Sequence, residues 1–163
     1  MSKASNAARA SNALSRSRAR LAAVQALYQM DMAETDLNAV IDEFRTLRLN
    51  VDAEDGTVAG GDPDHFVRIL TGVVARQREL DPLIDQQLAT GWRLVRVDAI
   101  LRAILRAGGF ELKELADVPV RVVISEYIDV AHAFFEGEEP KVVNGVLDQM
   151  ARKLRPGGLP ARK

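Results

Sequence analysis

The sequence predicts an all-α protein, and three observations support this fold class. The chain has 163 residues and is 47% hydrophobic, which is enough apolar material to bury a sizeable core. Its apolar residues recur every three or four positions in one segment after another, which is the spacing of one helix face. Proline and glycine stand between these segments, where helices begin and end. We therefore expect about six or seven helices in one domain.

Two helices are predicted in the N-terminal third. The first, with Ser15 or Ser17 as its N-cap, carries one apolar stripe formed by Leu21, Val24, Leu27 and Tyr28. The second repeats this spacing with Leu37, Val40, Ile41, Phe44 and Leu47. A loop should follow between Asn50 and Asp62, because Asp55-Gly56 and Gly60-Gly61 are typical turn sequences.

A third helix is predicted to begin at Pro63, since proline is well suited to the first helical turn. Its apolar face comprises Phe66, Ile69, Leu70, Val73 and Val74. Asp81-Pro82 has the same pattern of cap and first residue, so we expect a new short helical segment there. That segment should end at Thr90-Gly91.

Three more helices are expected in the C-terminal half. One runs from about Val97 to Leu115, and its Gly108-Gly109 pair costs ~1 kcal/mol per glycine, which indicates a neighbouring backbone packed closely there. The next begins at Val118-Pro119, where the β-branched residues could form a strand but the apolar face continues at helical spacing. The last opens at Glu138-Glu139-Pro140 and stops at Pro156.

The net charge of −1 hides an uneven distribution along the chain. Residues 1–30 and 151–163 each carry five Lys or Arg and no acid, which leaves 12 bases against 23 acids between them. A basic arm on an acidic body favours a localised contact with a polyanion over a general coat on nucleic acid. Two alternatives are a solvated tail and, from the acid-poor and Ser-rich start, a mitochondrial transit peptide.

The sequence offers no catalytic constellation. Cysteine is absent, which excludes disulfides and thiolate metal sites, and His65 and His132 are too far apart to pair on one helix. Phosphate-loop and hydrolase motifs are absent as well. No apolar run reaches the roughly 18 to 20 residues of a membrane span. We expect no enzymatic activity, no cofactor, no metal and no membrane association.

Several short motifs are informative as an ordered set. The first helix contains Ala23-Val24-Gln25-Ala26-Leu27-Tyr28, and the long central helix contains Ile104-Leu105-Arg106 followed by Phe110-Glu111-Leu112. The last third contains Asp117-Val118-Pro119, Ile124-Ser125-Glu126 and Lys141-Val142-Val143-Asn144-Gly145-Val146-Leu147-Asp148. With these motifs, over about Arg16 to Pro156, the chain resembles the NusB family of transcription antitermination factors.

The resemblance implies a NusB-like fold of two small packed helical bundles. Residues 1–15 would be a flexible basic arm, 16–156 a single NusB-like helical domain and 157–163 a flexible tail. It implies a bacterial, cytoplasmic factor that binds the boxA element of ribosomal RNA leader transcripts together with NusE, a small-subunit ribosomal protein, in the antitermination complex on RNA polymerase. The implied RNA-binding residues are Arg16, Arg18, Arg20, Glu138 and Lys141. The implied NusE-binding residues are Leu94, Asp98, Leu101, Arg102 and Glu138.

The chain departs from the family pattern at two positions. Val142 stands where the family has an aromatic residue, and Glu138 stands where it usually has Asp. The lost aromatic removes a stacking surface worth roughly 1 to 3 kcal/mol per base. For Asn144-Gly145 we expect an amide that bonds a neighbouring helix beside a glycine that permits close approach. The main alternative function is a helical scaffold or protein-interaction module without specific RNA binding; a fragment of a NusB-like methyltransferase fits poorly, because no nucleophilic cysteine is present.

Overall fold

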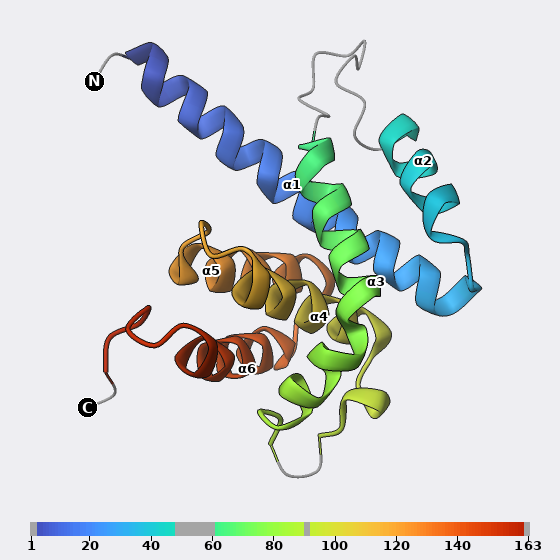
Figure 1. The fold of residues 1–163 in the computed structure, drawn as a ribbon, viewed down its shortest axis with the longest axis vertical. Helices are drawn as coiled ribbons and strands as arrows, with labels where there is room; N and C mark the ends of the chain where they lie inside the picture. Colours follow the sequence, from blue (N-terminus) through green and yellow to red (C-terminus); the bar gives the residue numbers. More distant parts are fainter. Residues whose placement is uncertain (1–2, 48–60, 90–91, 162–163) are drawn as a thin grey trace. The chain divides into compact units, whose positions relative to one another are not determined.

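The computed structural model describes residues 3–47, 61–89 and 92–161, which form six α-helices and one short 3-10 helix (Figure 1). No strand occurs among these residues, and the predicted all-α fold class is confirmed. The chain divides into two compact units, Met1–Leu70 and Thr71–Lys163. Within the described helices, no segment is both long and apolar enough to cross a membrane.

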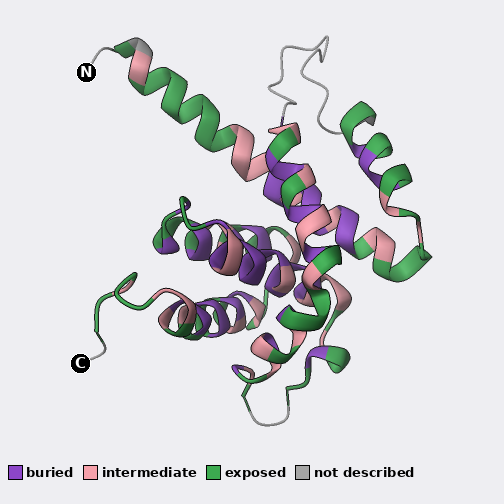
Figure 2. Cartoon of the chain, viewed as in Figure 1, coloured by how far each residue is buried: buried purple, intermediate pink, exposed green. Residues whose placement is uncertain are grey.

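The first unit begins with α1, Lys3–Ala33, a helix of 31 residues. The predicted helix start at Ser15 or Ser17 is therefore wrong. The residues before them are rich in alanine, the strongest helix former, so the helix extends to Lys3 without needing a cap at either serine. Ser17 instead donates its hydroxyl proton to the Ala13 carbonyl, 3.0 Å away inside the helix. The first turns of α1 are mostly exposed (Figure 2), and flexibility of residues 1–15 stays a prediction.

A tight turn joins α1 to α2, Leu37–Leu47. Glu34 takes up a left-handed backbone with φ 50°, and its amide still donates to the Met30 carbonyl at 3.1 Å, which closes α1. Asp36 caps the second helix, because its Oδ2 accepts from the amides of Asn38 and Ala39 at 3.1 and 3.3 Å. The turn thereby returns α2 alongside α1, with which it makes its contacts.

The start of α3, Pro63–Asp85, completes the core of this unit. Pro63 occupies the first helical turn as predicted, and Asp62 caps the helix by accepting from the His65 amide at 3.1 Å. Phe66 of α3 stacks on Phe44 of α2 with ring centroids 5.6 Å apart, and both side chains are almost fully buried. Within this unit α2 thus contacts α1 along the helix and α3 through this ring pair.

The second unit starts within α3, which continues through Pro82 to Asp85. The predicted break at Asp81-Pro82 is wrong. Proline loses its own amide hydrogen bond and crowds the carbonyl four residues before it, but the helix continues, and the Gln86 amide resumes the pattern by donating to the Pro82 carbonyl at 3.1 Å. Asp81 does not cap a new helix; its two carboxylate oxygens accept from the Arg106 guanidinium at 2.9 Å each.

Three longer helices pack against one another in this unit: α4, Ala99–Glu114; α5, Val120–Phe134; and α6, Glu139–Leu154 (Figure 1). Asp98 caps α4 by accepting from the Ile100 amide at 2.8 Å. The predicted helix starts at Pro119 and at Glu138-Glu139-Pro140 are confirmed. Their apolar faces turn toward one another and form the core, drawn purple in Figure 2.

The Gly108-Gly109 pair marks a close contact, as predicted, but the neighbours are side chains rather than a backbone. A Cβ at Gly108 would lie 2.8 Å from Leu147 Cδ1, and one at Gly109 would lie 3.0 Å from Met150 Cε. Both glycines therefore let α6 side chains approach the α4 backbone. Beside them the Tyr127 hydroxyl donates to the buried Glu111 carboxylate at 2.5 Å.

Arg155, just after α6, holds the C-terminal end of α4. Its guanidinium donates to the carbonyls of Glu111, Leu112 and Leu115 at 2.6 to 2.9 Å, and also to that of Val118. The Glu111 and Leu115 carbonyls also accept from the amides of Leu115 and Val118 at 3.0 Å each, so the arginine adds a second donor to both and ties the end of α4 to the turn that follows it. Burial lowers the pKa of Arg155 below its ordinary value.

Candidate nucleic-acid interface

The three predicted arm residues differ in how far α1 exposes them. The Arg16 side chain is 40% exposed, and its Nε lies 4.0 Å from Asp62 Oδ2. This ion pair is loose, so a phosphate could take the place of the carboxylate. Arg18 is half-buried, and its Nη1 is a buried donor without a hydrogen-bond partner. Since residues two apart on a helix point about 200° away from each other, Arg16 and Arg18 present their charges on different sides of α1.

Arg20 is the clearest correction to the predicted arm. Its side chain is only 2% exposed, so it cannot reach a phosphate without unfolding its surroundings. Its neighbours in sequence, Ala19 and Ala22 to Val24, are buried too, so α1 is covered on most of its sides at this level. The Arg-x-Arg-x-Arg pattern gave no sign of this, because Arg16 and Arg20 are four residues apart on the same side of the helix and differ only in how far the rest of the protein covers them.

Sequence reasoning also passed over Arg9. It is exposed and lies seven residues, close to two full turns, before Arg16, so the two share one face of α1. The seven-residue interval was the signal that could have found it. Arg9 and Arg16 form the exposed cationic face of the first unit.

In the second unit, Glu138 and Lys141 lie together at the start of α6. Both side chains are exposed, and the Glu138 carbonyl accepts from the amides of Lys141 and Val142 at 2.9 and 3.1 Å. Glu138 takes the N-cap position without using its side chain as a cap, so the carboxylate remains exposed at the helix end. The structure thus places these two predicted residues one turn apart on an accessible surface.

The predicted NusE-binding residues separate into exposed and buried ones. Asp98 is exposed, whereas Leu94 and Leu101 are each 1% exposed and can support a docking surface but not form it. Arg102 is half-buried, and its Nη1 lies 3.3 to 3.5 Å from the carbonyls of Leu94, Val95 and Val97. It holds the turn that precedes α4, which is a positioning role.

That turn contains the short 3-10 helix Leu94–Arg96, and its exposed side chains were missed from sequence. Val95 is 76% exposed and Trp92 is 37% exposed, although both are large and apolar. The turn's backbone is fixed to the end of α3, because the Leu94 amide donates to Asp85 Oδ1 at 2.8 Å. A Trp in a segment bounded by Gly91 and Arg93 carries no helical periodicity, so only its residue type could have drawn attention to it.

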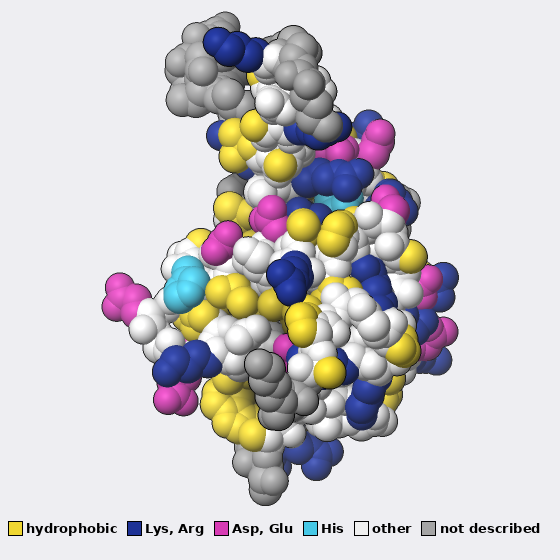
Figure 3. Space-filling model, turned by 90° about the vertical axis from the view of Figure 1, so that its left-hand side faces the viewer, with side chains coloured by type: hydrophobic (Ala, Val, Ile, Leu, Met, Phe, Trp, Pro, Cys, Tyr) yellow, Lys and Arg dark blue, Asp and Glu magenta, His cyan; other side chains and the backbone are white. Residues whose placement is uncertain are grey.

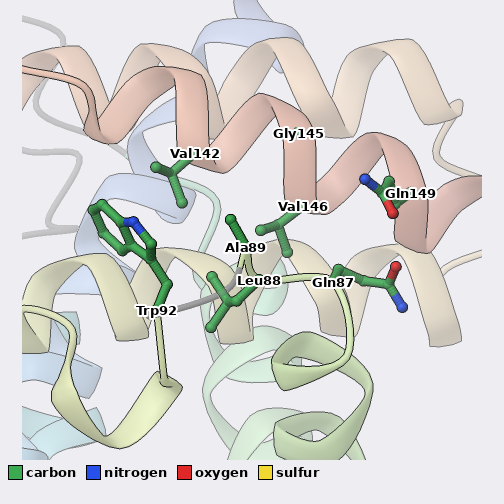
Figure 4. Close-up of a pocket in the computed structure, with 8 residues that line it drawn as sticks. All are labelled: Gln87, Leu88, Ala89, Trp92, Val142, Gly145, Val146 and Gln149. Atoms are coloured by element: carbon green, nitrogen blue, oxygen red, sulfur yellow. The ribbon is translucent and has the colours of Figure 1, made fainter.

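Two hollows border Trp92. One, of about 200 Å³, runs between the end of α3 and α6, where Trp92 lies beside Val142 and near Leu88 and Val146 (Figure 4). A Cβ at Gly145 would meet nothing within 4 Å, so the predicted close approach there is wrong, and this glycine leaves the groove open. The other hollow, of about 240 Å³, lies on the side of Asp98 and Glu139.

The face drawn in Figure 3 has no continuous basic patch, because its Lys and Arg side chains are interspersed with acidic and apolar ones. Among the described residues, no three His, Asp or Glu side chains gather in a way that could hold a metal ion. The groups that could bind a ligand are therefore confined to two places. One is the set of guanidinium donors on α1, and the other is the aromatic and charged surface around the start of α6.

Comparison with known proteins decides the family. The NusB family model matches residues 17–152. The chain belongs to the NusB family. NusB transcription antitermination proteins from Bartonella henselae and Rhodopseudomonas palustris (strain BisB18) are 52% and 54% identical to it over 140 residues. These alignments cover 86% of this chain and 89% and 83% of the relatives. NusB proteins are antitermination factors rather than enzymes, in agreement with the sequence prediction.

Solved NusB structures share the fold. T. maritima NusB is 29% identical, covers 86% of this chain and 93% of its own, and superposes with a TM-score of 0.70. A chain in the crystal structure of antitermination factors NusB and NusE with double-stranded RNA gives a TM-score of 0.71. That chain is 22% identical over 85% of this chain and 97% of its own length. At this identity the likeness shows a shared fold and nothing more. The predicted fold is thus confirmed at the level of the family.

Proposed function

We propose that this NusB-family protein binds the boxA element of ribosomal RNA leader transcripts together with NusE, and that it joins the antitermination complex on RNA polymerase in the bacterial cytoplasm. Family membership carries the proposal: relatives more than half identical are named transcription antitermination protein NusB. The NusB and NusE structure with RNA supports both partners, since a chain in it has this fold.

The RNA contacts should come from two surfaces. On α1, Arg16 and Arg18 supply guanidinium donors for phosphates, with exposed Arg9 extending the same cationic face as Arg16. On α6, exposed Lys141 adds a further cation. Arg20 takes no direct part, because it is buried.

NusE should dock on the second unit, against the turn before α4 and the start of α6. Asp98 and Glu138 are the exposed groups of the predicted set, and Leu94, Leu101 and Arg102 hold the surface in shape from beneath. The exposed apolar Val95 adds a contact of the kind that protein interfaces bury. A surface formed jointly by this protein and NusE would discriminate between bases, which guanidinium contacts to phosphates alone do not.

Fluorescence anisotropy with labelled boxA and scrambled RNA, each with and without NusE, tests the proposal. Arg16→Ala/Arg18→Ala should weaken binding and reduce the salt slope by up to about 0.7 per lost single-strand phosphate contact. Arg45→Ala, an exposed arginine on α2, is the matched control and should bind as the parent protein does. Equal affinity for boxA and scrambled RNA in the presence of NusE would contradict specific recognition. An unchanged salt slope in the double variant would show that the arm is a bystander.

A further inference from the structure

Asp62 has a fixed place beside the exposed cationic face of α1. Its amide donates to the Ser15 carbonyl at 2.9 Å, so the backbone just before α3 is tied to α1. Its Oδ1 accepts from the His65 amide at 3.1 Å and caps α3. Its other oxygen, Oδ2, lies 4.0 Å from Arg16 Nε. Two backbone hydrogen bonds therefore hold the Asp62 charge next to Arg16.

Arg16 has no carboxylate near it on its own helix. From Lys3 to Met30 the sequence of α1 contains no Asp or Glu, so none stands three or four residues from Arg16, where ion pairs form along a helix. Asp62, far along the chain, supplies the counter-charge instead. The Arg16 side chain is 40% exposed and that of Asp62 is 32% exposed. A phosphate can reach this guanidinium, but it meets a carboxylate that is already there.

A phosphate and the Asp62 carboxylate compete for the same guanidinium. Both are anions that accept hydrogen bonds from the N–H groups of arginine, and both fit its planar fork. An RNA that binds Arg16 must displace the carboxylate, and its phosphate also comes close to a like charge that repels it. An exposed ion pair changes an equilibrium constant by up to about fivefold, so the effect on RNA affinity is modest but measurable.

We propose that Asp62 regulates the RNA-binding face of α1 by competing with RNA phosphate for Arg16. In the free protein the carboxylate partly neutralises Arg16, and RNA gains that contact only by displacing it. The cost falls on any RNA that uses Arg16, whatever its sequence, and further contacts such as those proposed with NusE offset it. This role rests on the proposed RNA binding by α1 and deepens it by naming the residue that regulates it.

Asp62→Asn separates the charge of this residue from its other contacts. Asparagine caps a helix about as well as aspartate, and the backbone bond to Ser15 remains, so the fold should be retained. Thermal melting checks this, and Asp62→Ser, which also caps a helix, replaces the asparagine variant if that variant melts early.

The full chain is titrated, without NusE, with fluorescently labelled oligouridylate, which tests phosphate contacts in the absence of a boxA sequence. Asp62→Asn should bind about two- to fivefold more tightly than the parent protein at about 50 mM salt. The gain should shrink toward about 200 mM salt, because dissolved ions screen an exposed ion pair. An affinity equal to that of the parent protein at both salt concentrations would overturn the proposal.

Two comparisons show whether the charge acts through Arg16. Asp64→Asn removes a nearby exposed acid and changes the net charge by the same amount, so it should gain little affinity. In a protein that already carries Arg16→Ala, Asp62→Asn should bring no gain, because the competitor has lost its target. An equal gain from Asp64→Asn, or a gain that persists without Arg16, would show a general effect of net charge and refute the competition.

The outcomes separate this role from the proposed function. If boxA recognition with NusE is specific but Asp62→Asn brings no gain, the competition is refuted and the proposed function stands. If Asp62→Asn gains affinity as expected but boxA is not preferred over scrambled RNA, the proposed function fails and the competition stands. Failure of both proteins to bind oligouridylate would also overturn the competition, since a guanidinium freed of its counter-charge should hold a phosphate.

Discussion

Two glycines in neighbouring helices should respond in opposite ways to the same substitution. Replacing a helical glycine by alanine favours the helix by up to ~1 kcal/mol, provided that the new methyl group has room. At Gly145 on α6 a Cβ meets nothing within 4 Å, so Gly145→Ala should raise the free energy of unfolding by about 0.5 to 1 kcal/mol. At Gly108 on α4 a Cβ would lie 2.8 and 3.0 Å from the two terminal carbons of Leu147 and 3.3 Å from Tyr127 Cδ2.

Leu147 and Tyr127 are both 0% exposed, so neither side chain can move outward to make room. Overpacking of this kind costs about 1 to 3 kcal/mol, which exceeds the gain in helix propensity. Gly108→Ala should therefore lower the free energy of unfolding by about 1 to 2 kcal/mol. Urea denaturation of both variants and the parent protein measures the difference. If Gly108→Ala is as stable as Gly145→Ala, the close packing of α6 on α4 described above is wrong.

Three further predictions concern polar contacts of the second unit. Arg155→Met should lower the free energy of unfolding by about 3 kcal/mol in urea denaturation, since it removes the four hydrogen bonds that the guanidinium donates to carbonyls between Glu111 and Val118; a loss under ~0.5 kcal/mol would contradict the clamp. Tyr127→Phe should cost ~1 to 3 kcal/mol by the same measurement, because it takes a donor from the buried Glu111 carboxylate, and an unchanged midpoint would refute that bond. The hydrogen bond from Lys113 holds the pKa of the Glu79 carboxyl below its ordinary value, so this contact stabilises the fold above about pH 4.3 and is lost as pH falls further. The melting temperature of Glu79→Gln should therefore fall less steeply with acid than that of the parent protein. Equal slopes of melting temperature against pH would contradict the contact.

The helices of the C-terminal half could be predicted closely, because the local signals there agree with the packing. Pro119 and Pro140 stand where proline is tolerated, and the apolar positions after each of them keep one helical face through to the core. Gly108-Gly109 was also informative, since a glycine pair inside a helical pattern costs stability unless something packs against it.

The errors arose where one local signal had two physical outcomes. Asp81-Pro82 resembles a cap followed by a first turn, yet α3 accommodates the proline inside the helix, and Asp81 pairs with Arg106, far away in sequence. Ser15 and Ser17 resemble caps, but a serine inside a helix can donate back to a carbonyl, as Ser17 does. The first outcome depends on a residue distant in sequence, and the second on the alanine-rich segment before Ser15, whose helix propensity outweighs the capping signal.

The candidate site was predictable only in part. Glu138 and Lys141 are exposed at the helix start, where the motif placed them, whereas Arg20 is buried, and its burial depends on which helices cover α1. Trp92 could not be assigned a role from sequence, because its exposure depends on the turn that Asp85 and Arg102 hold in place. Tertiary contacts, rather than composition, decide which cations and rings reach a ligand.

Specific RNA recognition shared with NusE is the central claim, and calorimetry of NusE binding tests it most directly. The affinity of NusE for this protein is measured alone, with boxA RNA and with scrambled RNA at equal concentration. Because coupling between two ligands is reciprocal, boxA should tighten NusE binding by the same factor by which NusE tightens boxA binding, and scrambled RNA should have a smaller effect. Equal NusE affinity under all three conditions would contradict the account.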